Sequence, residues 1–277
     1  MSSDDNLILT RVEDNVGIIT LNRPDKLNAL NWELAQALAR QLYTWRDDDE
    51  VRAIVLHGSG RAFCAGGDVD WIAGEGDRPL PGTSDPSRPI PRSQRKTPGG
   101  PLFDVVRQIV AVDKPVIAAV HGATVGAGLS YAMACDRRFG DTTTKMAAIF
   151  TSVGVAPDCG ISYFLPRIVG LPNALMMVET GRMFKAAECK ELGLLDELVD
   201  EGQAFAAALA YARELAGRAS VAVDMARRMI HMSAAGSSLE EILDFEGIAG
   251  VIVASTSDAK EGTMSFLEKR KPVFRGV

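Results

Sequence analysis

The sequence predicts an α/β fold followed by a helical C-terminal segment, and two observations carry that prediction. A buried strand, a glycine-containing loop and a helix follow one another twice, first after residue 52 and again after residue 116. Beyond residue 201 the apolar residues recur almost only at helical spacing. A chain of 277 residues is near the upper size for one hydrophobic core. We therefore expect a core in residues 1–200 and a helical segment in residues 201–277.

The first elements of the expected core are a hairpin and a helix. Residues 7–12 and 16–21 are β-prone runs separated by a short polar turn, which predicts a hairpin. Asn31 can cap a helix in which Leu34, Leu38, Leu42 and Trp45 follow at helical spacing. Residues 52–57 and 116–120 are so continuously apolar that we expect two strands buried on both faces.

Residues 74–101 contain seven prolines, together with glycine, serine and arginine. Such a composition cannot sustain a helix or the interior of a sheet. We expect a long loop beside the first glycine site, either a lid or specificity element or a segment without fixed structure.

The later part of the chain is expected to be mainly helical, with residues 194–199 as its one strand. Helical patterns cover residues 204–218, 221–232, 239–254 and 259–269. Their apolar stripes must be buried, either against the protein's own core or against a neighbouring subunit.

Charge and composition exclude several classes of function. A net charge of −6 argues against a nucleic-acid groove, which needs clustered lysine and arginine. The cysteines form no C-x-x-C pair, as expected of reduced thiols in a cytoplasmic protein. The N-terminal residues lack a signal pattern, and no apolar run approaches the ~20 residues of a membrane span. The three histidines, His57, His121 and His231, show no metal-ligand spacing.

The first glycine loop, residues 58–68, ends in Ala65-Gly66-Gly67-Asp68. A dinucleotide-binding loop would need a third glycine where Phe63 stands, so that interpretation is not favoured. Two adjacent glycines instead let a ligand atom approach the backbone and leave the Gly67 N–H free to donate.

The second loop, residues 121–128, also leads from a buried strand into a helix. Free N–H groups at a helix start favour negative charge, and Ala127 is the natural donor there. Taken alone, the small residues of either loop are more often explained by close packing of a strand against a helix.

Four ordered motifs together resemble the crotonase superfamily, also called the enoyl-CoA hydratase/isomerase family. They are RPDKLNAL at 23–30, FCAGGD at 63–68, KPVIAAVHG at 114–122 and GVAPDCG at 154–160. The resemblance implies a ClpP/crotonase-like spiral of ββα units and C-terminal helices that pack across subunits in a homotrimer or a dimer of trimers. It further implies an acyl-CoA thioester as substrate, with no cofactor besides the coenzyme A that the substrate carries.

The same resemblance implies where the substrate binds. The N–H groups of Gly67 and Ala127 match the oxyanion hole that holds the thioester oxygen. The residues expected to contact substrate are Lys26, Leu27, Ala29, Ala65, Asp68, Val69, Asp70, Phe150 and, from a neighbouring protomer, Lys269. On residue chemistry alone, Lys269 is a solvated surface charge.

The acid/base residue decides which reaction is expected. Hydratases of the family use two glutamates, whose positions fall on Ser130 and Phe150 here, and neither residue can serve as a carboxylate. Asp158 is left, although an aspartate before a helix is commonly just an N-cap. The run at 154–160 resembles the phenylacetate-degradation isomerase branch, in which the matching aspartate is the sole acid/base. We therefore expect an isomerase that moves a double bond by a 1,3-proton transfer. The alternatives are a hydratase with unconventional residues and a non-catalytic acyl-CoA-binding protein.

Overall fold

The computed structural model describes residues 7–72 and 99–277 and confirms the α/β class. Most of the loop expected at 74–101 lies outside the described residues. Its end differs from the expectation, because Gly100 and Pro101 already belong to a helix, α4. Proline is compatible with the first turn of a helix, where no intrahelical N–H bond is lost, so the proline count concealed this start.

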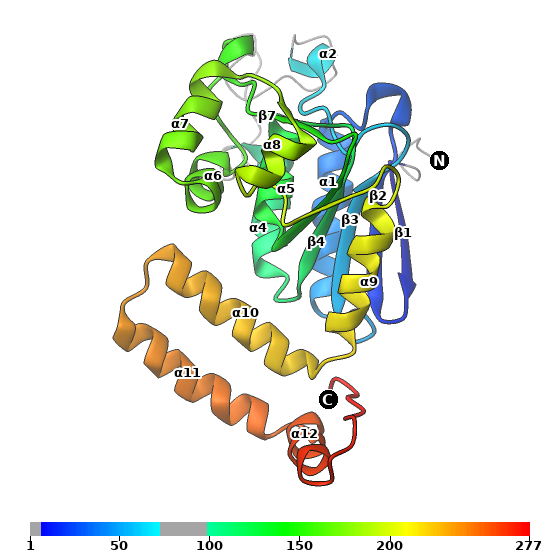
Figure 1. The fold of residues 1–277 in the computed structure, drawn as a ribbon, viewed down its shortest axis with the longest axis vertical. Helices are drawn as coiled ribbons and strands as arrows, with labels where there is room; N and C mark the ends of the chain where they lie inside the picture. Colours follow the sequence, from blue (N-terminus) through cyan, green and yellow to red (C-terminus); the bar gives the residue numbers. More distant parts are fainter. Residues whose placement is uncertain (1–6, 73–98) are drawn as a thin grey trace, which may run out of the picture.

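The strands of the described residues form two sheets (Figure 1). The main sheet has the order β1 (Ile8–Glu13), β2 (Val16–Leu21), β3 (Ala53–Gly58), β4 (Val116–Val120), β6 (Arg137–Asp141) and β9 (Glu197–Val199). The small sheet has the order β5 (Ala123–Val125), β7 (Lys145–Ala147) and β8 (Phe184–Lys185). In the main sheet only β1 and β2 pair antiparallel, as the expected hairpin, and the other neighbours are parallel.

The helices of the described residues are α1 (Trp32–Arg46), α2 (Val69–Ile72), α4 (Gly100–Ala111), α5 (Ala127–Ala134), α6 (Ile161–Val169), α7 (Leu171–Thr180), α8 (Ala186–Glu191), α9 (Ala204–Ala216), α10 (Ser220–Ala235), α11 (Leu239–Ala254) and α12 (Ser257–Leu267). Three of them, α1, α5 and α6, follow a pair of strands and so form ββα units. The described loops also contain the short 3-10 turns η2 (Pro24–Lys26) and η3 (Thr151–Val153). As expected, Asn31 caps α1, because its side chain accepts a hydrogen bond from the Leu34 N–H at 3.0 Å.

The central strands β3 and β4 are buried on both faces, as their apolar runs predicted. Alternate residues of each strand point to opposite sides. Ile54, Leu56 and Val116 pack in the core shared with α1 and α4, whereas Val55 and Ile117 pack against α9 on the other face. The result is a sheet between two helical layers, with α9 in front of the sheet and α1 behind it in Figure 1.

Helix α9 was expected within a separate helical segment starting at residue 201, yet it covers a face of the core sheet. The helices that stand clear of the sheet begin with α10, and α10 to α12 form the lower part of Figure 1. The expected strand at 194–199 is shorter, and a second late strand, β8, precedes it.

Helix α10 is attached to the core by ionic contacts. Arg227 donates to the carboxylate of Asp136 at 2.8 Å and to the carbonyls of Ile109 and Val110 at the C-terminal end of α4. His231 contacts the other oxygen of Asp136 at 2.7 Å. The Arg227 cation is favourably placed at the C-terminal end of α4. Together the contacts of Arg227 and His231 hold α10 against the core.

Asp224, on the same helix, leads to a prediction about stability. Burial raises its pKa to about 7, against the opposing charges of Lys114 and Arg227. An unfolded aspartate loses its proton above pH ~4, whereas Asp224 in the folded protein keeps its proton up to about pH 7. The free energy of unfolding therefore falls as pH rises from ~4 to about 7. Asp224→Asn should remove this fall. Thermal unfolding of both proteins from pH 4 to 8 should show a gain for the variant that grows with pH. An equal gain at pH 4 and pH 8 would contradict this assignment.

Candidate active site

The two glycine loops meet at one edge of the main sheet. They follow β3 and β4, which are parallel neighbours, so both strands end at the same edge. The loops then pair with each other, because the Phe63 N–H donates to the His121 carbonyl at 2.8 Å and the Val125 N–H to the Cys64 carbonyl at 2.9 Å.

The N–H group of Gly67 points away from Leu30, the residue with which its loop pairs. Leu30 donates to the Gly66 carbonyl at 2.7 Å and accepts from the Asp68 N–H at 2.9 Å. Gly67 lies between Gly66 and Asp68 in this parallel bridge, so its N–H points away from Leu30. The Gly67 N–H consequently has no hydrogen-bond partner in residues 7–72 and 99–277.

The N–H group of Ala127 is also left without a partner in the described part of the chain. Ala127 is the first residue of α5 and follows Gly126, whose φ of 54° turns the chain into the helix. A first-turn N–H has no intrahelical acceptor, and the positive end of the helix dipole lies there. It is therefore available to a ligand oxygen.

The two free amides lie on adjoining segments. A Cβ placed on Gly66 would lie 2.9 Å from the Val125 carbonyl oxygen and 3.7 Å from the Ala127 nitrogen. A Cβ on Gly128 would lie 2.5 Å from the Cys64 carbonyl oxygen. The expected close packing and the expected free donors thus occur together, since only glycine lets the loops approach so closely.

Asp158 lies in the turn before α6, but it does not cap that helix. The N-cap is Gly160, and no side chain caps it. Atom Oδ1 of Asp158 is buried without a hydrogen-bond partner among the described residues. The alternative of an N-cap aspartate is therefore wrong, and helix capping does not explain this carboxylate.

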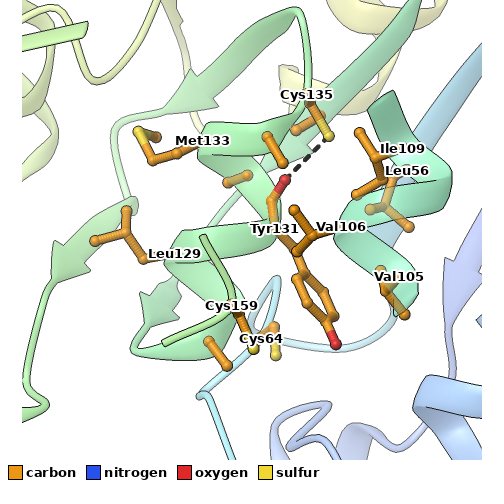
Figure 2. Close-up of a cluster of buried hydrophobic side chains, with 14 of the residues drawn as sticks. Leu56, Cys64, Val105, Val106, Ile109, Leu129, Tyr131, Met133, Cys135 and Cys159 are labelled. Atoms are coloured by element: carbon orange, nitrogen blue, oxygen red, sulfur yellow. Dashed lines mark hydrogen bonds between the residues drawn. The ribbon is translucent and has the colours of Figure 1, made fainter. Parts of the chain in front are cut away.

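Burial raises the pKa of Asp158, and a hydrogen bond with the Cys159 thiol partly opposes the rise. Cys159 and Cys64 lie beside the ring of Tyr131, inside the apolar cluster drawn in Figure 2. The carboxyl group therefore stands at the border of a dry region, where its neutral and charged forms are closer in free energy than in water.

One buried hydroxyl joins this turn to the second glycine loop. The Ser130 Oγ lies 3.3 Å from the Gly126 carbonyl oxygen and 3.1 Å from the Asp158 carbonyl oxygen. The turn that carries Asp158 is thereby next to the start of α5, on the side of the core that holds the free amides. No sequence pattern pointed to this contact.

The segment around residues 26–29, which holds three of the residues expected to contact substrate, lies along the first glycine loop. The Ala65 N–H donates to the Leu27 carbonyl at 3.0 Å, and Lys26 forms an ion pair with Asp70 at 2.8 Å. Leu27 adopts a left-handed φ of 50°, and Ala29 directly follows the buried Asn28.

The remaining residues that were expected to contact substrate differ in burial and location. Asp68 is buried and pairs with Arg23 at 2.8 Å, which fits a role in supporting the loop. Val69, at the start of α2, is exposed, and Phe150, at the start of η3, is buried. Lys269 follows α12, at the opposite end of the molecule from α2 (Figure 1), and is not part of this chain's own site.

Within residues 7–72 and 99–277, no group of three or more histidine, cysteine or acidic side chains is arranged to hold an ion. His57 and His121 make local contacts instead, with Thr20 at 2.7 Å and the Gly60 carbonyl at 3.0 Å. None of the described helices is long and apolar enough to cross a membrane.

A family model described as enoyl-CoA hydratase/isomerase matches residues 11–277. The chain belongs to the enoyl-CoA hydratase/isomerase family. This confirms the resemblance and the spiral fold inferred from the four motifs.

Relatives within the enoyl-CoA hydratase/isomerase family carry names of both reactions. The 1,2-epoxyphenylacetyl-CoA isomerase of Escherichia coli is 34% identical over 97% of this chain and 98% of its own length. The short-chain-enoyl-CoA hydratase of Clostridium acetobutylicum is 29% identical over 96% of both. The crystal structure of an enoyl-CoA hydratase from Polaromonas is similar with a TM-score of 0.85 at 30% identity, over 97% of this chain and 99% of that one. Similarity therefore fixes the family, and the choice of reaction depends on the site.

Proposed function

We propose that the protein is an acyl-CoA isomerase that moves a carbon–carbon double bond by a 1,3-proton transfer, with Asp158 as its single acid/base. The observation that carries the proposal is the half-buried side chain of Asp158, whose Oδ1 is buried without a hydrogen-bond partner in the described residues. The positions of both hydratase glutamates hold Ser130 and Phe150, so a second carboxylate for holding a water is lacking there.

The proposed reaction begins when the carboxylate of Asp158 removes a proton from the carbon next to the thioester carbonyl. The C–H electron pair moves toward the carbonyl oxygen, and the resulting dienolate is stabilised by the N–H groups of Gly67 and Ala127. Preorganised donors at a developing oxyanion contribute several kcal/mol, about 2.7–4 for one donor. Asp158 then returns the proton two carbons away, and the thioester re-forms with the double bond shifted.

The raised pKa of Asp158 supports this role. A group that accepts and then releases the same proton works best when its pKa approaches the working pH, because both directions of transfer are then accessible. Burial moves the pKa of Asp158 in this direction. The proposed chemistry uses no cofactor beyond the coenzyme A carried by the substrate.

Substrate recognition follows from the segments that border the amides. We propose that Lys26, Leu27 and Ala29 bind the coenzyme A portion, and that Ala65 and residues 68–70 line its path to the thioester. Phe150 stands close to the second loop, since Ile149 approaches Gly126, and is proposed to contact the acyl group. Buried, unpaired thiols at all four cysteines fit a protein of the reducing cytoplasm.

The proposed activity is tested with a 3-enoyl-CoA in water enriched in oxygen-18. We expect the conjugated 2-enoyl-CoA to accumulate with no labelled oxygen in the product. Labelled 3-hydroxyacyl-CoA as the main product would show a hydratase, as the names of several relatives suggest. Tight binding of the thioester without turnover would show an acyl-CoA-binding protein. Either of these two results would contradict the proposal.

We also propose a homotrimer, alone or paired into a dimer of trimers. Two different regions expose large apolar side chains, one on α10 and α11 and the other around η3 and α7. They are Ile230, Leu239, Leu243, Ile248 and Val251 in the first, and Val153, Val155, Leu171, Leu175 and Met183 in the second. Two unlike surfaces on one chain favour a head-to-tail contact, which closes into a ring. Lys269 of one subunit is then proposed to approach the coenzyme A of the next.

Light scattering provides the test of this assembly. A chain of 29.7 kDa should give a particle of three or six chains. Replacing Leu171 and Leu175 by aspartate should dissociate it, since charge is placed in the proposed contact. A wild-type protein that stays monomeric at micromolar concentration would contradict the proposed assembly.

A further inference from the structure

Ser130 occupies the interior of the short helix α5 and is fully buried. A serine hydroxyl inside a helix commonly donates to the carbonyl four residues earlier, which for Ser130 is Gly126, at 3.3 Å. Here a second acceptor is closer, the carbonyl of Asp158 at 3.1 Å, from a segment 28 residues farther along the chain. Because a hydroxyl has one proton, the two carbonyl oxygens share it in a bifurcated bond, which connects two parts of the site.

The first acceptor belongs to the peptide unit that carries the proposed oxyanion donor. The Gly126 carbonyl and the Ala127 N–H share one planar peptide group and point in opposite directions. A bond that fixes the carbonyl oxygen consequently fixes the direction of the N–H. The Ser130 backbone N–H also donates to the Gly126 carbonyl, at 3.0 Å.

The second acceptor belongs to the main chain of the proposed base. Within the described residues the Asp158 side chain has no bond at Oδ1, and its hydrogen bond with the Cys159 thiol ties it only to the same turn, so its position depends on the backbone beneath it. The backbone there is strained, because Cys159 adopts a left-handed φ of 50° before Gly160. The Asp158 carbonyl accepts from the Ser130 hydroxyl and from the Ile161 N–H at 3.1 Å, and these bonds hold the turn.

We infer that Ser130 is a positioning residue. Its hydroxyl holds the Asp158 carboxylate and the Ala127 N–H in a fixed position relative to each other. It does not touch the substrate; it couples the group that moves the proton to the group that holds the enolate. The position that carries a carboxylate in hydratases thus has a different task in this chain. This inference rests on the proposed isomerase function.

Ser130→Ala tests the inference in an isomerase assay. Misplacing a catalytic group by about an ångström lowers rates by as much as ~10²-fold, so we expect kcat to fall roughly 10- to 100-fold. KM should change less than about twofold, because the proposed binding segments at 26–29 and 65–70 do not contact Ser130. Ser130→Thr keeps the hydroxyl and should recover most of kcat.

Ser265→Ala is the matched control. Ser265 is also buried in a helix, and its hydroxyl donates only within that helix, to the Gly262 carbonyl at 3.0 Å, as far as the described residues show. The control removes a comparable hydroxyl far from the site and should leave kcat unchanged. A kcat for Ser130→Ala within about twofold of wild type would overturn the inference, as would an equal loss of kcat in both alanine variants.

Two further comparisons keep the test decisive. If Ser130→Ala does not fold, Ser130→Thr and Ser130→Cys take its place, and kcat should be higher for the stronger donor, threonine; equal values would overturn the inference. Wild-type activity separates the two claims. A chain that never isomerises a 3-enoyl-CoA refutes the proposed function, whereas an active wild type with an unaffected Ser130→Ala refutes only the role of Ser130.

Discussion

Replacing Asp158 by asparagine is expected to lower kcat for isomerisation of a 3-enoyl-CoA by about 10²- to 10⁴-fold, the usual contribution of a positioned acid or base. Asparagine has nearly the same shape but cannot take a proton, so substrate binding should persist. The measurement is the rate of formation of the conjugated thioester, together with the Kd of a non-reactive acyl-CoA. A variant as active as wild type would refute the assignment of Asp158.

The same variant should be more stable than wild type at neutral pH. The raised pKa means that the folded state disfavours the ionised carboxyl, so stability is lost as pH rises above the ordinary pKa of aspartate. Asparagine keeps a carbonyl acceptor but removes the partly buried negative charge, which should stabilise by about 1 kcal/mol, or roughly 2–4 °C in Tm for a chain of this size. A Tm below that of wild type would show that the carboxylate has a structural partner.

Asp224→Asn is the matched control for Asp158→Asn. Asp224 also has a raised pKa and a buried Oδ1 without a partner in the described residues, but it lies on α10, away from both glycine loops. It should gain stability and keep full activity. Loss of activity in both variants would mean that burial of a charge, and not proton transfer, explains the effect at position 158.

Replacing Ala127 by proline is expected to lower kcat/KM by about 10²- to 10³-fold, because it deletes one of the two proposed oxyanion donors. Ala127 is the first residue of α5, where proline removes no intrahelical hydrogen bond. Gly126 before it has no Cβ, which eases the restriction on a residue that precedes proline. Activity close to that of wild type would contradict the role of this N–H.

Ala186→Pro controls for the proline itself. Ala186 is likewise an alanine at the first position of a helix, α8, and both residues are 5% exposed. It should keep full activity. If Ala127→Pro does not fold, Gly66→Ala takes its place, because the new Cβ would push against the Val125 carbonyl and displace Gly67. A fully active Gly66→Ala protein would then contradict the proposed geometry.

The elements that sequence predicted well have strong local signals. The hairpin has a polar turn between two β-prone runs, and Asp14 and Asn15 indeed adopt the left-handed conformation. Helix α1 has both an apolar stripe and a capping asparagine. Strands β5, β7 and β8 were not anticipated, because two or three residues carry no measurable period.

The candidate site was predicted less from the residues than from the family resemblance. Local propensity favoured Asp158 as an N-cap, yet the structure gives that place to Gly160, and only the resemblance had pointed to a chemical role. The free amide of Gly67 depends on pairing with Leu30, far away in sequence. The contact between Ser130 and Asp158 could not be foreseen, since a hydroxyl that joins two loops leaves no periodic signal.

A crystal structure of the Asp158→Asn protein with a bound 3-enoyl-CoA tests the central claim most directly. The account predicts that the thioester oxygen lies about 2.7–3.1 Å from both the Gly67 and the Ala127 nitrogen. It also predicts that the side chain at position 158 faces the carbons that exchange the proton. A thioester oxygen bound away from both amides, or a side chain at position 158 on the far side of the acyl group, would contradict it.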